Sequence, residues 1–439
     1  MKTIFYRRLQ YGSCLFLLVL GILVYGNHLQ NPFQFDTVAY IVNQHRLNNI
    51  NEQLTINYLF EDFFHRSFLQ ITIAFNAHLD GLRTFSYHLI NLLLHLINSL
   101  LVYFITSRMW CHFRLTSYQS AETEKGFVSL FTAALFLLHP IQTESVVYIM
   151  SRSEVFAGTF YLSAFLLFQV YLTKNRPVKT RFKIIVLFII STAFILGFSV
   201  KQTLITLPLI LLLYFLFGQV SESVSIRWLN KWKWKIGFFT FVGIILLFYK
   251  LLTDELFLIG PSLAGEDIGR LNYMLTQPYV IVYYYLKLLI LPVNLNIDPD
   301  ILLVTEWWSW KFITPLIGIA GLIYFSYRVK ERFLLLYLIL WFLIVLSPSS
   351  SIITLSDLAA EHRTYLASFS FYVAVSYCVY KVPHLIYSAH PKKSRNIVAV
   401  LCIFILIVFS VLTIQRNKIW ISEVSLWSDT LKKSPKNIR

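Results

Sequence analysis

Long apolar runs separated by short polar or basic loops dominate the pattern of the chain. These runs lie near 10–27, 84–107, 126–140, 153–173, 184–200, 203–217, 236–252, 312–327, 333–347, 369–381 and 396–414. A membrane-spanning helix needs roughly 20 predominantly apolar residues, with some leeway for tilt. The pattern therefore predicts an all-α polytopic integral membrane protein with about eleven transmembrane helices.

Two of the apolar runs need a separate interpretation. The first follows two arginines, as in a signal peptide, but no small-residue cleavage site comes after it, so a retained helix is expected. Residues 277–293 are nearly long enough to span, yet acidic residues flank them on both sides. Lys287 and the neighbouring tyrosines are typical of an interfacial helix, so this run is expected to lie in the plane of the outer leaflet.

Composition and charge favour the same class of protein. Hydrophobic residues make up 57% of the 439 residues and charged residues only 14%, whereas soluble domains carry about 25% charged residues. Of the 38 Lys and Arg, 22 lie in the loops at 1–9, 108–125, 174–183, 221–235, 328–332 and 381–395, beside four acids. The positive-inside rule assigns these loops to the cytoplasm, with the N-terminus inside and the C-terminus outside. The net charge of +16 is thus a loop bias, and no nucleic-acid partner is expected.

Ionisable residues gather in the loops on the opposite, outer side, including the long first outer loop at 28–83. The candidate site residues there are Asp36, Arg66, His139, Glu144, Arg152, Glu154, Lys201, Glu361, His362 and Arg363. A carboxylate can act as general base on an acceptor hydroxyl, and Arg and Lys can hold a phosphate leaving group. A histidine beside them can shuttle a proton. This combination suits displacement of a lipid-linked phosphate at the membrane surface.

Each of these residues also has a structural interpretation that the residues alone leave open. Asp36 can cap a helix, and His139 before its proline can end a helix at a turn. Lys201 can extend to the lipid head groups, and the charges at 152 and 154 can be ordinary interfacial charges. Arg363 can form a structural ion pair with Glu361.

Several motifs occur together along most of the chain. They are F-x-F-D ending at Asp36, residues 86–95, H-P-x-x-T-E from His139 followed by R-x-E from Arg152, and residues 199–202, 361–366 and 427–435. With them the sequence resembles the membrane half of the multispanning O-glycosyltransferases that carry C-terminal tetratricopeptide repeats. These include eukaryotic O-mannosyltransferases and bacterial relatives, and they belong to the GT-C superfamily. The resemblance implies a polyprenyl-phosphate sugar as donor.

The resemblance also implies roles for particular residues. Asp36 matches the first acid of the family's outer-loop pair, the catalytic base, while Thr37 stands where the second acid is expected. Glu144 or Glu154 is the candidate to supply a second carboxylate, if one is needed. The expected phosphate or donor contacts are Arg152, Lys201 and Arg363, with His139 and Glu144 shaping the pocket. No metal or other cofactor is expected, and the four cysteines show no metal-ligand or disulfide spacing.

The expected function is transfer of a sugar from a lipid-linked donor to a protein hydroxyl on the outer face of a bacterial inner membrane. Residues 1–414 would form the transferase domain, and residues 415–439 an outer segment leading toward repeats that this chain lacks, either through truncation or because another chain supplies them. The alternatives are a non-catalytic membrane scaffold and a lipid or polysaccharide carrier. A carrier would place ionisable groups near the bilayer midplane and often show inverted repeats.

Overall fold

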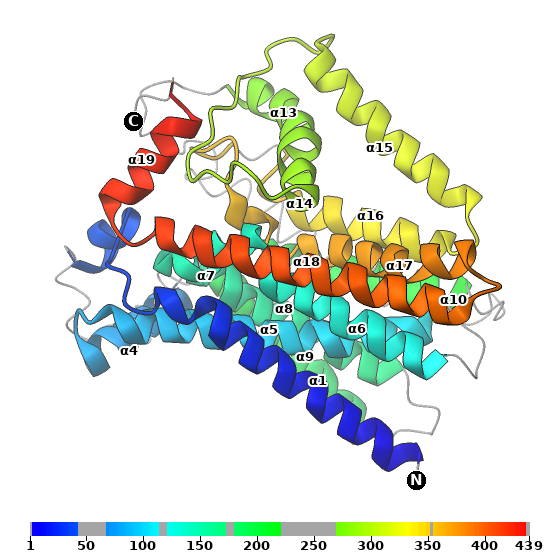
Figure 1. Cartoon of the computed structure of the whole chain (residues 1–439). Helices are drawn as coiled ribbons and strands as arrows, with labels where there is room; N and C mark the ends of the chain where they lie inside the picture. Colours follow the sequence, from blue (N-terminus) through cyan, green and yellow to red (C-terminus); the bar gives the residue numbers. More distant parts are fainter. Residues whose placement is uncertain are drawn as a thin grey trace.

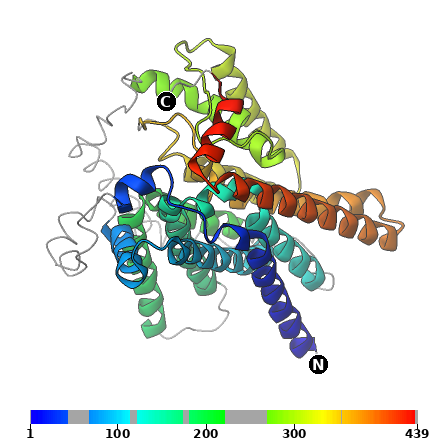
Figure 2. The same ribbon diagram turned by 60° about the vertical axis from the view of Figure 1, so that its left-hand side comes forward.

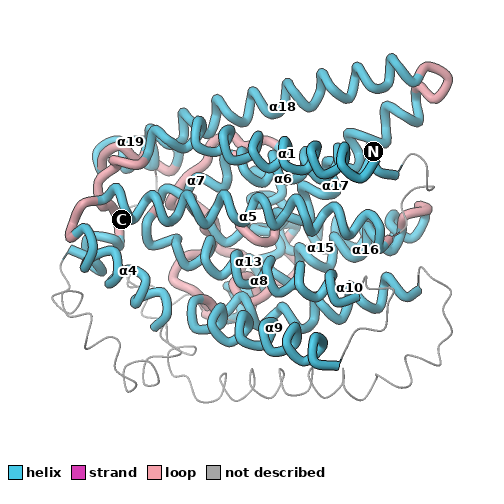
Figure 3. The backbone as a smooth tube through the Cα atoms, turned by 90° about the horizontal axis from the view of Figure 1, so that it is seen from below, coloured by secondary structure: helices cyan, strands magenta, loops and turns pink. Residues whose placement is uncertain are grey.

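The computed structural model describes residues 2–42, 67–113, 121–172, 180–220, 269–351 and 354–435. Every regular element in these ranges is a helix, which confirms the all-α expectation (Figures 1 and 3). The expected span at 236–252 and the candidate Arg66 lie outside the described residues.

The longer helices are α1 (Lys2–Tyr25), α4 (Ser67–Asp80), α5 (Thr84–His112), α6 (Ala121–Leu138), α8 (Arg152–Leu172), α9 (Thr180–Val200), α10 (Leu207–Val220), α13 (Arg270–Tyr279), α15 (Trp310–Arg328), α16 (Arg332–Leu346), α17 (Ser368–Ile386), α18 (Pro391–Ile419) and α19 (Glu423–Lys433). The short elements are η1 (Gly26–His28), η2 (Val38–Val42), η5 (Pro140–Gln142), α7 (Thr143–Val147), η6 (Ile149–Ser151), η7 (Gln202–Thr206), η8 (Val280–Leu286), α14 (Lys287–Ile290) and η9 (Glu361–Thr364).

Within the described ranges, six helices are long and apolar enough to cross a membrane. They are Leu9–His28, Thr84–Trp110, Ile149–Leu172, Arg181–Val200, Trp310–Arg328 and Pro391–Ile419. A seventh results if Glu124–Leu138 and Pro140–Val147, which are bent by 49° relative to each other, form one span. Gln202–Gly218 and Arg332–Leu346 are apolar but shorter. The total of eleven spans and the side of the membrane on which each terminus lies stay predictions.

The run expected in the membrane plane forms one continuous helical stretch, Arg270–Ile290, made of α13, η8 and α14. It begins seven residues earlier than the apolar pattern indicates. The wide π-helical turns of η8 follow Pro278, which removes a donor from the helical hydrogen-bond ladder. Figures 1 and 2 show this stretch, α15 and α19 on the same side of the bundle.

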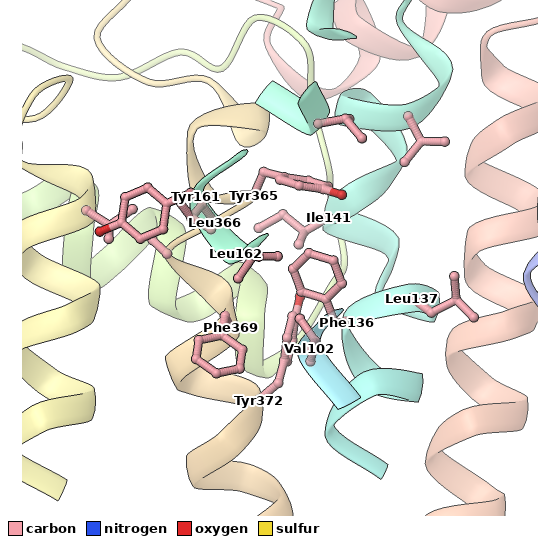
Figure 4. Close-up of a cluster of buried hydrophobic side chains, with 14 of the residues drawn as sticks. Val102, Phe136, Leu137, Ile141, Tyr161, Leu162, Tyr365, Leu366, Phe369 and Tyr372 are labelled. Carbon is pink, nitrogen blue, oxygen red and sulfur yellow. The ribbon is translucent and has the colours of Figure 1, made fainter. Parts of the chain in front are cut away.

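The interior of the bundle is where α5, α6, α8 and α17 meet. Figure 4 shows Phe136, Leu162, Phe369 and Tyr372 among the buried side chains that converge there. Tyr365, just after η9, is buried at the same place; its hydroxyl lies 2.9 Å from both His95 Nδ1 and Asn98 Nδ2. Because both partners belong to α5, these contacts fix the chain that follows η9 against the central helices.

The two ends of the bundle differ in what they carry. Figure 1 shows that α1 begins at the end where α15 meets α16 and α17 meets α18. α7 and α19 lie at the other end, which we call the polar end. The loops predicted to be cytoplasmic connect helices at the end of the bundle where α1 begins. The residues expected on the outer side therefore belong to the polar end.

Candidate active site

A break in the sixth helix brings the first candidate carboxylate to the polar end. α6 ends at Leu138, and His139 caps the short η5 helix with Pro140 in its first turn. A proline is tolerated in the first turn but not in a helix interior, so the helical direction changes here. Glu144 follows in the first turn of α7, where an acid is favoured by the helix dipole.

Glu144 is held by one residue from a distant part of the chain. His362 Nδ1 lies 2.6 Å from Glu144 Oε1, and the His362 backbone N–H donates to Glu144 Oε2 over 3.2 Å. An ionised carboxylate only accepts hydrogen bonds, so Nδ1 carries the proton in this pair. In the neutral ring Nε2 is then left as a proton acceptor.

The same histidine faces a second carboxylate. His362 Nε2 lies 3.9 Å from Glu154 Oε1, and Lys201 Nζ forms an ion pair with that oxygen. Glu144, His362, Glu154 and Lys201 are called here the site cluster. It joins α7, η9, the first turn of α8 and the residue between α9 and η7.

Burial and charge in the site cluster suit proton transfer. The side chains of Glu144 and Glu154 are 3% and 6% exposed, whereas those of His362 and Lys201 are 25% and 14% exposed. Burial lowers the pKa of His362, and the neighbouring Glu144 carboxylate opposes that shift. A neutral imidazole that remains partly accessible can take up and release a proton near neutral pH.

Asp36 is exposed and begins the helical turn that leads into η2. Burial raises the pKa of Tyr148, and the Asp36 carboxylate raises it further. Tyr148 also bonds through its backbone N–H to the Glu144 carbonyl oxygen over 3.3 Å. Tyr148 therefore stands between the candidate base and the site cluster.

The residue before Asp36 has an unusual backbone. Phe35 has a φ of 55°, in the left-handed region that non-glycine residues seldom adopt. Its ring lies 5.8 Å from the rings of both Tyr148 and Trp427, centroid to centroid. These contacts hold Asp36 at the junction of the first outer loop, the α7–η6 turn and α19.

Arg152 is fully buried and bonded entirely to protein groups. Its Nε donates to Asn91 Oδ1 over 2.9 Å, and one terminal nitrogen donates to Asn76 Oδ1 over 2.7 Å. Further bonds reach the backbone oxygens of Thr72 and Tyr87. These partners belong to α4 and α5, so the contacts favour a structural role that joins three helices.

His139 is likewise fully buried with both ring nitrogens in use. Nδ1 accepts from the Ile141 backbone N–H over 3.2 Å, and Nε2 lies 3.0 Å from the Leu289 carbonyl oxygen. The ring thus ends α6 and ties the break to α14. This is the helix-end interpretation that the sequence had left open.

Glu361 and Arg363 do not pair with each other among the described residues. Glu361 Oε1 accepts from the Asn296 backbone N–H, and its other oxygen lies 3.7 Å from Arg416. Arg363 instead donates to the Asp357 carbonyl oxygen over 2.9 Å. Neighbouring side chains of η9 point to different elements, Glu361 toward Arg416 of α18 and His362 toward Glu144 of α7.

The partners of Glu361 were missed by sequence reasoning. Arg416 Nη1 lies 3.0 Å from Asp429, and Lys433 Nζ lies 2.6 Å from the same carboxylate oxygen. Glu361, Arg416, Asp429 and Lys433 are called here the α18–α19 cluster. The i,i+4 spacing of Asp429 and Lys433 was the one local signal, since nothing near Glu361 in sequence points to Arg416.

The described residues include no group of three or more His, Cys, Asp or Glu side chains arranged to hold a metal ion.

Comparisons with known proteins give relatives along nearly the whole chain. A protein O-mannosyl-transferase of Caenorhabditis elegans is 26% identical over 443 residues, covering 97% of this chain and 58% of that protein. Protein O-mannosyl-transferase TMTC1 of Homo sapiens is 23% identical over 481 residues, 98% of this chain and 52% of that protein. Tmtc3 of Drosophila melanogaster is 30% identical over 164 residues, 33% of this chain and 18% of that protein.

These similarities confirm the resemblance carried by the motifs. The chain spans about half the length of the Caenorhabditis elegans and human TMTC1 relatives. No family model and no solved structure matches the chain.

Proposed function

We propose that a chain similar to protein O-mannosyl-transferases over 97% of its length is itself a membrane glycosyltransferase that acts on proteins. Its donor would be a polyprenyl-phosphate-linked hexose, with mannose the first choice from the names of the relatives. The acceptor would be a protein hydroxyl at the outer face of the membrane. The observation that carries the proposal is that Asp36 and Glu144 of the site cluster both lie next to Tyr148 at the polar end.

The chemistry is a single displacement. The acceptor oxygen forms a bond to the anomeric carbon, the bond from that carbon to the phosphate oxygen breaks, and polyprenyl phosphate leaves with the electron pair. The hydroxyl proton passes to a base. Asp36 is the proposed base because it is exposed beside Tyr148, and a carboxylate positioned at the nucleophile is an effective general base.

The remaining groups would serve the leaving phosphate and the proton. Lys201 and Arg363 are the proposed phosphate contacts, since both cations are partly accessible at the polar end. His362, oriented by Glu144, would exchange a proton through Nε2. Arg152 is assigned to positioning because its donors are already bonded.

Membrane position follows from the same proposal. The lipid tail of the donor would stay in the bilayer beside the bundle, while its phosphate lies at the polar end. We assign this end to the outer face, the periplasmic side of a bacterial inner membrane, from the distribution of Lys and Arg in the loops.

The direct experiment is transfer by the purified chain in proteoliposomes. Mannosyl-phosphoryl-polyprenol and a Ser/Thr-containing peptide are the substrates, and the mannosylated peptide is the product measured. We expect Asp36→Asn to abolish transfer while the melting temperature stays unchanged. Asp80→Asn, at the end of α4, is the matched control and should retain the wild-type rate.

Two results would argue against this function. A wild-type rate in Asp36→Asn would remove Asp36 as the base. If the wild-type chain binds donor and peptide but transfers no sugar, the scaffold alternative gains, because Thr37 stands where the family has a second acid.

A further inference from the structure

A small, partly open pocket lies next to Asp36 at the polar end. It is lined by Asn31, Pro32, Gln34, Thr37, His88, Val147, Tyr148, Ile149 and Trp420. These residues come from the first outer loop, α5, the α7–η6 turn and the residue after α18. The pocket has room for about one group the size of a water molecule.

Besides the Tyr148 hydroxyl, four polar atoms of the lining are buried and have no hydrogen-bond partner among the described residues. They are Gln34 Oε1, Thr37 Oγ1, His88 Nδ1 and Trp420 Nε1. The four residues are between 1% and 3% exposed, so solvent does not satisfy these atoms freely. Because buried polar groups in proteins are almost always bonded, four such atoms around one pocket call for a polar occupant.

The hydrogen bonds that these residues do make define the polarity of the pocket. Gln34 Nε2 donates to the Trp420 carbonyl oxygen over 2.6 Å, which leaves Oε1 as an acceptor. His88 Nε2 lies 3.0 Å from the Asn31 carbonyl oxygen and must donate, so Nδ1 of the neutral ring also accepts. Trp420 Nε1 can only donate, and Thr37 can do either.

This set of atoms fits a hydroxyl. An alcohol oxygen can donate one hydrogen bond and accept two. It can donate to one of the two acceptors, Gln34 Oε1 or His88 Nδ1, and accept from the Trp420 indole N–H and the Thr37 hydroxyl. No side chain with a full charge lines the pocket, so an anion such as phosphate is disfavoured. The stacked rings of Tyr148 and Trp420, 5.7 Å apart, give the carbon attached to such a hydroxyl an apolar wall.

We propose that this pocket binds one neutral alcohol hydroxyl and positions it beside Asp36. The inference rests on the proposed function, because it deepens the site of that reaction. Asp36 lies between Gln34 and Thr37 in sequence. Its carboxylate is close enough to Tyr148, which lines the pocket, to raise the pKa of that tyrosine. The hydroxyl belongs either to the side chain of the acceptor peptide or to the sugar of the donor.

The experiment is a double-mutant cycle read by binding rather than turnover. Wild-type protein and Thr37→Val are placed in nanodiscs, and the Kd is measured for a threonine peptide and for the same peptide with valine in place of threonine. The Kd is also measured for mannosyl-phosphoryl-polyprenol and for polyprenyl phosphate without the sugar. Thr305→Val, at an exposed position away from the pocket, is the matched control.

One lost hydrogen bond weakens binding by about 2- to 10-fold. If the hydroxyl comes from the acceptor, Thr37→Val raises the Kd of the threonine peptide by this factor and leaves the valine peptide unchanged. If it comes from the donor, the mannosyl lipid alone is affected. Trp420→Phe, which keeps the ring and removes the N–H, should change the Kd of the same probe.

Other outcomes overturn the inference. Unchanged Kd values for every probe in both variants, with only a lower melting temperature, would mean that the pocket holds a structural water. The same holds if the wild-type protein does not distinguish the probes that carry the hydroxyl from those that lack it. Absent transfer by the wild type, with the hydroxyl preference intact, contradicts the proposed function and leaves the pocket assignment standing.

Discussion

The two charged clusters of the polar end contain the neighbouring residues Glu361 and His362, and they differ in solvent accessibility. Glu361 in the α18–α19 cluster is fully buried, and its partner Arg416 is 4% exposed. His362 in the site cluster is 25% exposed, and Lys201 is 14% exposed. A buried ion pair whose members contact only protein positions segments of the chain. A cluster with accessible, protonatable groups can exchange protons and bind substrate. The α18–α19 cluster therefore holds η9 in place, whereas the site cluster contains the η9 residue suited to proton transfer.

The largest effect should come from breaking the α18–α19 cluster. Arg416→Gln leaves the Glu361 carboxylate buried beside Asn296 without its cation. Removing one partner of a buried ion pair typically costs about 3–5 kcal/mol, so the melting temperature should fall strongly at alkaline pH, where the Glu361 carboxyl, whose pKa is raised by burial, is ionised. The measurement is thermal unfolding in detergent.

The double variant Arg416→Gln/Glu361→Gln is the control for that loss. It removes both charges and should recover a large part of the lost stability, because no unpaired charge remains buried. Equal melting temperatures for Arg416→Gln and the wild type would mean that Glu361 does not depend on this cation.

The site cluster should respond in activity rather than in stability. His362→Gln keeps a polar side chain beside Glu144 but removes the titrating ring. Loss of a general acid–base group lowers rates by about 10²- to 10⁴-fold, so we expect kcat to fall by about 100-fold or more. His384→Gln, on a histidine in the last turn of α17, is the matched control. A wild-type kcat would remove the ring from the chemistry.

The smallest expected effect is a pH dependence of opposite sign in the two clusters. Burial lowers the pKa of His362 below its unfolded-state value of 6.5. The contribution of this group to stability is therefore fully present above pH 6.5 and is lost as the pH falls. Burial raises the pKa of Glu361, so its contribution is present below 4.5 and is lost as pH rises.

Melting temperatures of the wild type, His362→Gln and Glu361→Gln measured from pH 4.5 to 8 check these signs. Relative to His362→Gln, the wild type should lose stability toward acid. Relative to Glu361→Gln, it should lose stability toward alkaline pH. The same sign in both comparisons would contradict the distinction between the clusters.

The helices were largely predictable because their signal is local. The runs near 84–107 and 312–327 correspond closely to α5 and α15. The run near 396–414 ends too early, since α18 continues to Ile419 through Arg416 and Asn417. Both are polar residues that find buried partners at the polar end, which a hydropathy pattern does not reveal.

The site was only partly predictable, for a different reason. Glu144 and His362 were both identified as candidates, but 218 positions separate them, and nothing local specifies that they touch. Adjacent charges suggested a pair between Glu361 and Arg363, whereas η9 sends these side chains to different helices. The unpaired atoms of Gln34 and His88 were unpredictable, because they depend on which neighbouring bonds are already made.

The conformation of Phe35, near the N-terminus, depends on a contact with α19, near the C-terminus. A non-glycine residue in the left-handed region costs about 1–3 kcal/mol and persists only where its surroundings hold it there. Those surroundings include the Trp427 ring, which belongs to α19. The order of the loop that carries Asp36 thus depends on a helix near the other end of the sequence. Loosening α19 would let that loop sample more conformations, and substrate binding would have to restore the lost order.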